Sequence, residues 1–229
     1  SLTEAHGGPV IPGGCEQKPL VSPDGTKIVF RACTGDNDDE AAELWVMNID
    51  GTNPIKVSGE ILEATKHSWS PDSQWILFSA DVNSDSRSRI YKVRKNGTGL
   101  VMLSEEEGNF CDNWAAWSPN GQWISFHRRN REMDPNTSEI WIMNTDGSNK
   151  RVLVEGIADD LDDGDWICGP HSWHPSSQWI AFKKNTYGYL HIINVKLAEQ
   201  KAASLAADNR EKKQRIMAII EQKQAEALS

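Results

Sequence analysis

The sequence predicts an all-β protein: a β-propeller of four four-stranded blades, followed by a C-terminal α-helical tail. First, one sequence motif occurs four times, as "PLVSPDGTKIVF", "HSWSPDSQWILF", "AAWSPNGQWISF" and "HSWHPSSQWIAF". Second, the prolines of these motifs, Pro23, Pro71, Pro119 and Pro175, lie 48, 48 and 56 residues apart, and a period of this length indicates a repeat architecture. Third, Gly and Pro are absent after residue 195, where the helix formers Ala, Glu, Lys and Gln dominate.

Each repeat predicts an antiparallel meander of four strands. The Ser-Pro-Asp-Gly line favours a turn after the first strand, and an apolar run such as "WILF" forms the second strand. The third strand reads "ELWVMN", "RIYKVR", "EIWIMN" or "LHIINV", and an Asp-Gly or Asn-Gly pair in three copies suits a hairpin to a short outer strand. One such sheet cannot bury both of its faces, so we expect the sheets to stack around a central axis.

We therefore divide the chain into a propeller, residues 1–195, and a helical tail, residues 196–229. The blades are assigned to residues of about 15–58, 59–106, 107–156 and 157–195. The last blade lacks an outer strand, which Val10 and Ile11 would supply if the ring closes on itself. Four blades are few, so the alternatives are a closed four-bladed ring, a larger ring shared by two chains, or a fragment of a longer propeller.

The patterns "WSPDGxxIxF" and "ELWVMNxDGT" resemble the TolB-type, or PD40 (WD40-like), β-propeller repeat over about residues 15–195. This resemblance implies a propeller whose ligands meet the loops that enter the innermost strands. It also favours a periplasmic or extracellular location. Relatives of this type include the periplasmic TolB component, propeller domains of prolyl-oligopeptidase-like peptidases and some polysaccharide lyases. The chain has no GxSxG motif, so the peptidase interpretation has no support.

Charge and hydropathy exclude two classes of partner. The formal net charge is −9, whereas a nucleic-acid partner selects for the opposite sign. No apolar run approaches the roughly 18–20 residues that a membrane-spanning helix needs. We therefore expect neither nucleic-acid binding nor a membrane span.

The loops before the Ser-Pro turns differ between repeats far more than the strands do, which is typical of binding loops on a fixed scaffold. We expect a non-catalytic interaction module that binds a protein or peptide partner with these loops. Exposed tryptophans anchor many interfaces, and arginine holds carboxylates with its planar fork. The candidate partner-binding residues are Trp114, Trp166, Asp112, His67, His171 and Arg128. For the tryptophans, the alternative is packing between blades.

Several cysteines and histidines fall at matching positions of the repeat. Cys15, Cys111 and Cys168 lie seven or eight residues before their turn proline, and His67 and His171 lie four before theirs. If they converge, thiolates and imidazoles suit Zn²⁺, and an oxidising compartment would permit a disulfide instead. Buried packing is the alternative for each cysteine.

An acidic loop is the candidate site for Ca²⁺, which prefers oxygen ligands. Its sequence is "DDLDDGD", residues 159–165, and a plain solvated loop is the alternative. The candidate ligands are Asp160, Asp162, Asp163 and Asp165.

Two further functions stay open. One is a lectin-like binder or polysaccharide lyase with a bound metal, in which Trp114, Trp166 and Tyr187 would stack on sugar rings. The resemblance implies that such lyases use a His or Tyr base with an Arg, a role for which His67, His171, His174 and Arg128 are the candidates. The other is an assembly protein that forms a homodimer through blade edges or through the tail, where Ile216, Ile219 and Ile220 fall near one helix face.

Overall fold

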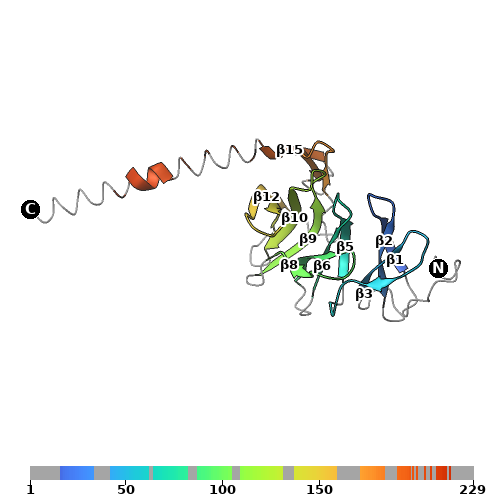
Figure 1. The fold of residues 1–229 in the computed structure, drawn as a ribbon. Helices are drawn as coiled ribbons and strands as arrows, with labels where there is room; N and C mark the ends of the chain where they lie inside the picture. Colours follow the sequence, from blue (N-terminus) through green and yellow to red (C-terminus); the bar gives the residue numbers. More distant parts are fainter. Residues whose placement is uncertain are drawn as a thin grey trace, which may run out of the picture. The chain divides into compact units, whose positions relative to one another are not determined.

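The computed structural model describes most of the predicted propeller and part of the tail (Figure 1). The described residues are 16–33, 42–61, 64–81, 87–104, 109–130, 137–158, 171–183 and 190–196, with the tail positions 198, 200, 204, 207, 210–215 and 217. Within them the strands form four antiparallel sheets that follow one another in chain order. The predicted all-β meanders are confirmed.

The sheets have simple up-and-down topology, with the strand order of the chain kept in each sheet. The first sheet contains β1 (Glu16–Val21), β2 (Lys27–Cys33), β3 (Ala42–Asn48) and β4 (Ile55–Lys56). The second contains β5 (Ala64–Trp69), β6 (Trp75–Ala80), β7 (Arg89–Arg94) and β8 (Val101–Met102). The third contains β9 (Phe110–Trp117), β10 (Trp123–Asn130), β11 (Thr137–Asn144) and β12 (Arg151–Ala158).

The fourth sheet has three strands in the described part of the chain: β13 (Ser172–Trp173), β14 (Trp179–Lys183) and β15 (Leu190–Asn194). This agrees with the absence of a hairpin signal after "LHIINV" in the sequence. The segment with Val10 and Ile11, expected to supply the missing strand, lies outside the described residues.

The serine of the Ser-Pro turn fixes the step from the first to the second strand. In the second sheet, the Ser70 hydroxyl donates to Asp72 Oδ1 (2.5 Å) and accepts the backbone N–H of Trp75 (2.8 Å). Asp72 Oδ1 in turn accepts the N–H of Gln74 (3.0 Å). The first and third sheets repeat these bonds with Ser22 and Ser118. Because the serine is buried, its hydroxyl replaces water as the partner of a turn N–H.

A second serine of the turn joins neighbouring sheets. Ser73 and Ser177 adopt positive φ values of 57° and 60°, at the position where the first and third repeats carry glycine. Their hydroxyls accept the N–H of Asp24 (3.0 Å) and Asn120 (2.9 Å) from the preceding sheet. The bond between sheets accounts for a residue other than glycine in a left-handed conformation.

The core lies between the sheets. One cluster combines Leu44 and Val46 of the first sheet with Ile76, Phe78 and Tyr91 of the second. A second cluster repeats the arrangement one sheet further on, with Leu77 and Ile90 packed with Ile124, Phe126 and Met143. Each sheet thus turns one face to the preceding sheet and the other to the following one, which is the packing of a propeller.

Ring closure is not part of the described contacts. In the described ranges, buried apolar clusters join the first sheet to the second and the second to the third, and hydrogen bonds join the third to the fourth. The described residues therefore build three sheet-to-sheet interfaces. The number of blades in the complete ring stays a prediction.

The tail is a unit of its own, Ile193–Ser229. Residues 210–215 are helical, and Arg215 pairs with Glu211 one turn away at 2.7 Å. Both side chains are largely exposed, so this pair contributes little to stability. Ile216, Ile219 and Ile220, the predicted apolar stripe, lie outside the described residues. No helix in the described part of the chain is long and apolar enough to cross a membrane.

We expect Ser70→Ala to lower the free energy of unfolding by about 1–3 kcal/mol, because it leaves the part-buried Trp75 N–H without its acceptor. Ser172→Ala, on the exposed side of β13, is the matched control and should change stability by less than about 0.5 kcal/mol. Urea denaturation of both variants measures the difference. Equal stabilities would contradict the role assigned to the turn serine.

Candidate functional site

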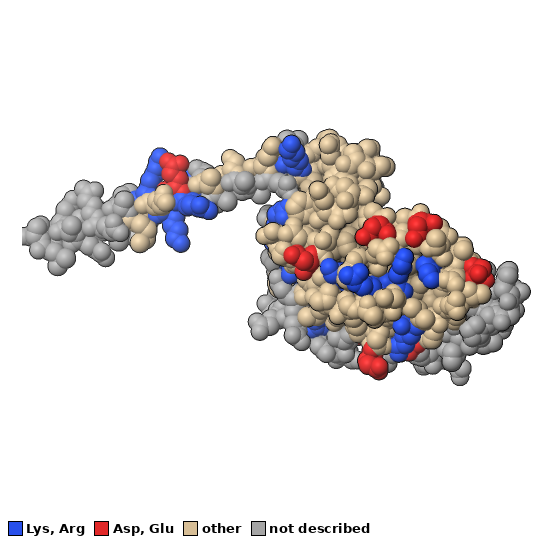
Figure 2. All heavy atoms as spheres, viewed as in Figure 1, with Lys and Arg blue, Asp and Glu red and all other residues tan. Residues whose placement is uncertain are grey.

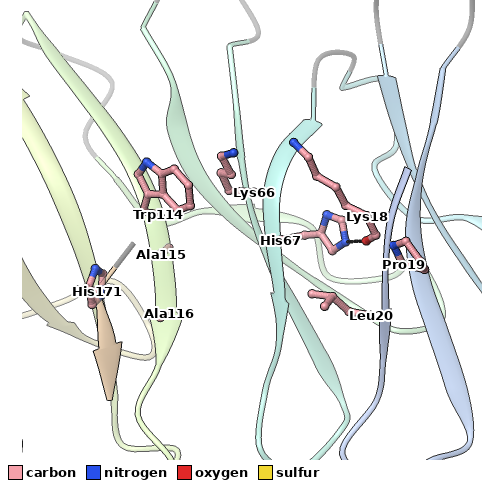
Figure 3. Close-up of a pocket in the computed structure, with 9 residues that line it drawn as sticks. All are labelled: Lys18, Pro19, Leu20, Lys66, His67, Trp114, Ala115, Ala116 and His171. Carbon is pink, nitrogen blue, oxygen red and sulfur yellow. Dashed lines mark hydrogen bonds between the residues drawn. The ribbon is translucent and has the colours of Figure 1, made fainter. Parts of the chain in front are cut away.

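A pocket of about 340 Å³ lies among the innermost strands of the propeller (Figure 3). Its lining comes from β1, β5, β9 and the residue before β13, and every lining residue stands three to five positions before a turn proline. The lining residues are Lys18, Pro19, Leu20, Lys66, His67, Trp114, Ala115, Ala116 and His171. Equivalent positions of the four repeats therefore line one cavity.

A bulge in the inner strand of each of the first three sheets directs these side chains. The register slips between Gln17 and Leu20 in β1 and between Thr65 and His67 in β5, and in β9 two residues oppose Phe126. The extra residues include Lys18, Lys66 and Trp114, and Lys18 and Trp114 have positive φ values of 52° and 57°. Bulges re-aim side chains next to functional sites, and left-handed non-glycine residues often mark such sites.

The rim of the pocket is cationic. Burial lowers the pKa of Lys18, and the positive charges of Lys66 and Arg31 lower it further. The Lys66 ammonium lies over the Trp114 ring, 4.2 Å from its centroid, and the aromatic face partly compensates for its lost solvation. Two ammonium groups held this close attract an anion.

His67 is neutral, and its Nδ1 has no hydrogen-bond partner among the described residues. Its Nε2 lies 2.8 Å from the carbonyl oxygen of Lys18 (Figure 3), so Nε2 carries the proton and donates. Its Nδ1 is then an acceptor, and it is buried without a partner among the described residues. Burial lowers the pKa of His67 to about 4, which keeps the ring neutral at pH 7.

His171 joins the pocket to the interface between the third and fourth sheets. Its Nε2 lies 2.5 Å from the Ser125 hydroxyl, which also accepts the Trp173 indole N–H (2.7 Å). Its ring stacks on His127 with 5.1 Å between centroids. Burial lowers the pKa of His127 to about 4 and that of His171 to about 3, with His127 lowering the latter further. Both rings are therefore neutral at pH 7.

Three of the residues proposed from the sequence meet in this pocket: Trp114, His67 and His171. Asp112 and Arg128 do not line it. They form a buried ion pair across β9 and β10, with two hydrogen bonds of 2.8 Å. The Arg128 guanidinium also lies 4.6 Å from the centre of the Trp141 ring. These contacts indicate that the pair holds the third sheet together.

Most of the proposed metal ligands lie outside the described residues: Cys15, Cys168, Asp160, Asp162, Asp163 and Asp165, together with Trp166 and Tyr187. Cys111 is described, and it is a free, buried cysteine that accepts a hydrogen bond from Asn113 (3.1 Å). Among the residues that the structure describes, no three His, Cys, Asp or Glu side chains come together in a way that could hold a metal ion. Zinc and calcium binding stay predictions.

Sequence reasoning missed Lys18 and Lys66. The signal was present, because both lie five residues before their turn prolines, Pro23 and Pro71. Trp114 occupies the equivalent position in the third repeat, five residues before Pro119. The recurrence of lysine at this position in the first two repeats is the signal that could have found them.

The surface charge is uneven. In the face seen in Figure 2, Lys and Arg side chains gather near the middle, and Asp and Glu lie around them. Basic side chains thus cluster on this face although the net charge of the whole chain is −9 (Figure 2).

Residues 12–215 match the sequence profile of the PD40 family, described as the TolB beta propeller domain. The chain belongs to this family. Its internal repeats, Ser-Pro turns and sheet order all agree with the assignment. A search of curated proteins finds no match.

Solved structures give the same fold. TolB from Acinetobacter baumannii superposes with a TM-score of 0.57 at 17% identity, over 77% of this chain and 40% of that protein. An oligogalacturonate lyase in complex with manganese gives 0.66 at 12% identity, over 83% and 54%. An oligogalacturonate lyase from Vibrio parahaemolyticus gives 0.53 at 19% identity, over 76% and 47%. This PD40 chain thus spans about half the length of these structures, and identities this low support the fold alone.

We expect stability to fall as the pH drops from about 7 to 5. The folded pKa values of His67, His127 and His171 lie below the ordinary value of 6.5, so the unfolded chain binds more protons in this range. Each buried neutral histidine then costs up to about 2 kcal/mol at pH 5 relative to pH 7, and the loss levels off below the folded pKa.

Urea denaturation at both pH values measures this slope. Substitution His127→Phe removes one of the three groups and should flatten the slope, while Ser172→Ala, at an exposed position without a titratable group, should leave it unchanged. A wild-type stability that does not change between pH 7 and 5 would contradict the neutral, buried state of these rings.

Proposed function

We propose that this PD40 propeller is a non-catalytic binding module that holds an acidic group of a protein or peptide partner in its central pocket. One observation carries the proposal: Lys18 and Lys66 lie side by side at the rim of a cavity built from the same position of successive inner strands. A carboxylate between the two ammonium groups would relieve their mutual repulsion.

The other lining residues favour a peptide. A volume of about 340 Å³ suits one or two side chains rather than a folded domain. Ala115 and Ala116 keep the wall of the cavity short, and the bare Nδ1 of His67 can accept an N–H of the bound segment. A peptide offers both groups, a carboxylate and N–H donors, in the same molecule.

The non-catalytic part of the proposal rests on how the histidines are used. His67 donates to the Lys18 backbone carbonyl, and His171 is bonded to Ser125. Each ring is held by the scaffold and keeps a lowered pKa. A general base needs a pKa nearer the working pH than the lowered values of these two rings. The family resemblance further suggests that binding takes place in the periplasm or outside the cell.

A second candidate is binding or cleavage of an acidic oligosaccharide. The likeness to oligogalacturonate lyases and the cationic pocket beside Trp114 favour it, because a uronate ring offers a carboxylate together with a face for stacking. Incubation with oligogalacturonate, monitored by the ultraviolet absorbance of unsaturated ends, tests cleavage. Steady product formation by the wild-type chain would overturn the non-catalytic proposal.

The binding test compares an Asp/Glu-rich peptide with the same peptide carrying Asn and Gln, by isothermal titration calorimetry. We expect the acidic peptide to bind more tightly, with an affinity that falls as salt rises. The variant Lys18→Gln/Lys66→Gln should weaken binding about tenfold or more, because charged hydrogen bonds are lost.

Lys95→Gln/Lys150→Gln removes the same charge away from the pocket and serves as the matched control. Its affinity should stay within about twofold of the wild type, as expected for distant surface charges in moderate salt. Equal losses in both double variants would show a general charge effect and contradict a pocket-specific site. Equal binding of the acidic and amide peptides would do the same.

A further inference from the structure

The fourth sheet exposes a face that the other sheets bury. Leu190 and Ile192 of β15 are 72% and 64% exposed, and Trp179 of β14 is 40% exposed. Large apolar side chains that gather on one face of a sheet mark an interaction surface rather than ordinary scatter.

Comparison with the equivalent residues of the other repeats shows what kind of surface this is. The positions equivalent to Leu190 in the first three repeats are Leu44, Ile90 and Ile140, and all three are fully buried. The positions equivalent to Ile192 in the first and third repeats, Val46 and Ile142, are 1% and 0% exposed. In the first sheet this face packs on the following sheet, against Ile76 and Phe78. The exposed face of the fourth sheet is therefore a sheet-packing face.

The edge of the same sheet is also open. β3, β7 and β11 each pair with an outer strand, whereas β15 pairs only with β14 in the described part of the chain. An apolar face beside an unpaired strand edge invites another sheet.

The candidate partner faces on a second copy are few. The first sheet would offer Ile28 and Phe30, but these are only 6% and 2% exposed, within a cluster that also contains Met47. The opposite face of the fourth sheet is occupied as well, since Ile180 and Phe182 are buried. The sheet-packing face that a copy leaves exposed in its described part is the one with Leu190 and Ile192.

We propose that two copies of this chain associate through these faces, with the fourth sheet of one copy packed on the fourth sheet of the other around a twofold axis. Such a contact is isologous, because the same patch serves both partners, and twofold dimers are the commonest assemblies. It would bury between two molecules the kind of apolar sheet face that the preceding sheets bury within one molecule. The proposal does not depend on the ligand of the central pocket.

Sedimentation velocity of the full chain over a range of concentrations tests this proposal. We expect a dimer for the wild type and a monomer for Leu190→Glu/Ile192→Glu at the same concentration. Both positions are exposed, so the variant should fold, and its circular dichroism spectrum checks this. Ile49→Glu/Val101→Glu alters two other exposed apolar residues, 50% and 44% exposed, and should leave the dimer intact.

Three results would overturn the proposal. They are a wild type that stays monomeric at every concentration, a dimer that survives Leu190→Glu/Ile192→Glu, and a control variant that dissociates equally. The second result would assign association to the tail or to another face. The third would indicate a general effect of added negative charge.

Discussion

The structure depends on the packing of one sheet against the next. The face with Ile76 and Phe78 meets the face with Leu44 and Val46, and the following interface repeats this arrangement. Each fully buried side chain of this kind contributes roughly 1.5–3 kcal/mol, which no single sheet can obtain alone. Because the sheets are held face to face, their inner strands are brought to a common axis, and a pocket between those strands results.

The candidate site is a local departure from the regular repeat. The bulges of β1, β5 and β9 insert an extra residue, and the left-handed conformations of Lys18 and Trp114 cost free energy that regular strands would not require. The sheet packing around them holds these conformations in place. The result is a cavity with clustered positive charge in a chain whose net charge is −9.

The sequence predicted the strands, the turns and the three strands that the fourth sheet has in the described part of the chain, because local turn chemistry and strand periodicity can be read directly from the repeat. It also named His67, His171 and Trp114 as candidate binding residues, and the structure places all three in the lining of one pocket. The burial of charged residues could not be predicted in the same way. Asp112 and Arg128 pair across two strands, and this pairing depends on strand register. The sequence alone does not show which residue will be the partner of a charged side chain. Ring closure depends on contacts between distant repeats, which local patterns do not specify.

Nuclear magnetic resonance titration of the full chain with an acidic peptide tests the central claim most directly, since it locates the ligand residue by residue. The account predicts that side-chain signals of Lys18, Lys66 and His67 shift with one common affinity, while those of Arg128 in the buried ion pair stay in place. Shifts confined to other surfaces, with the Lys18 and Lys66 signals unchanged at saturation, would contradict a binding site at the propeller axis.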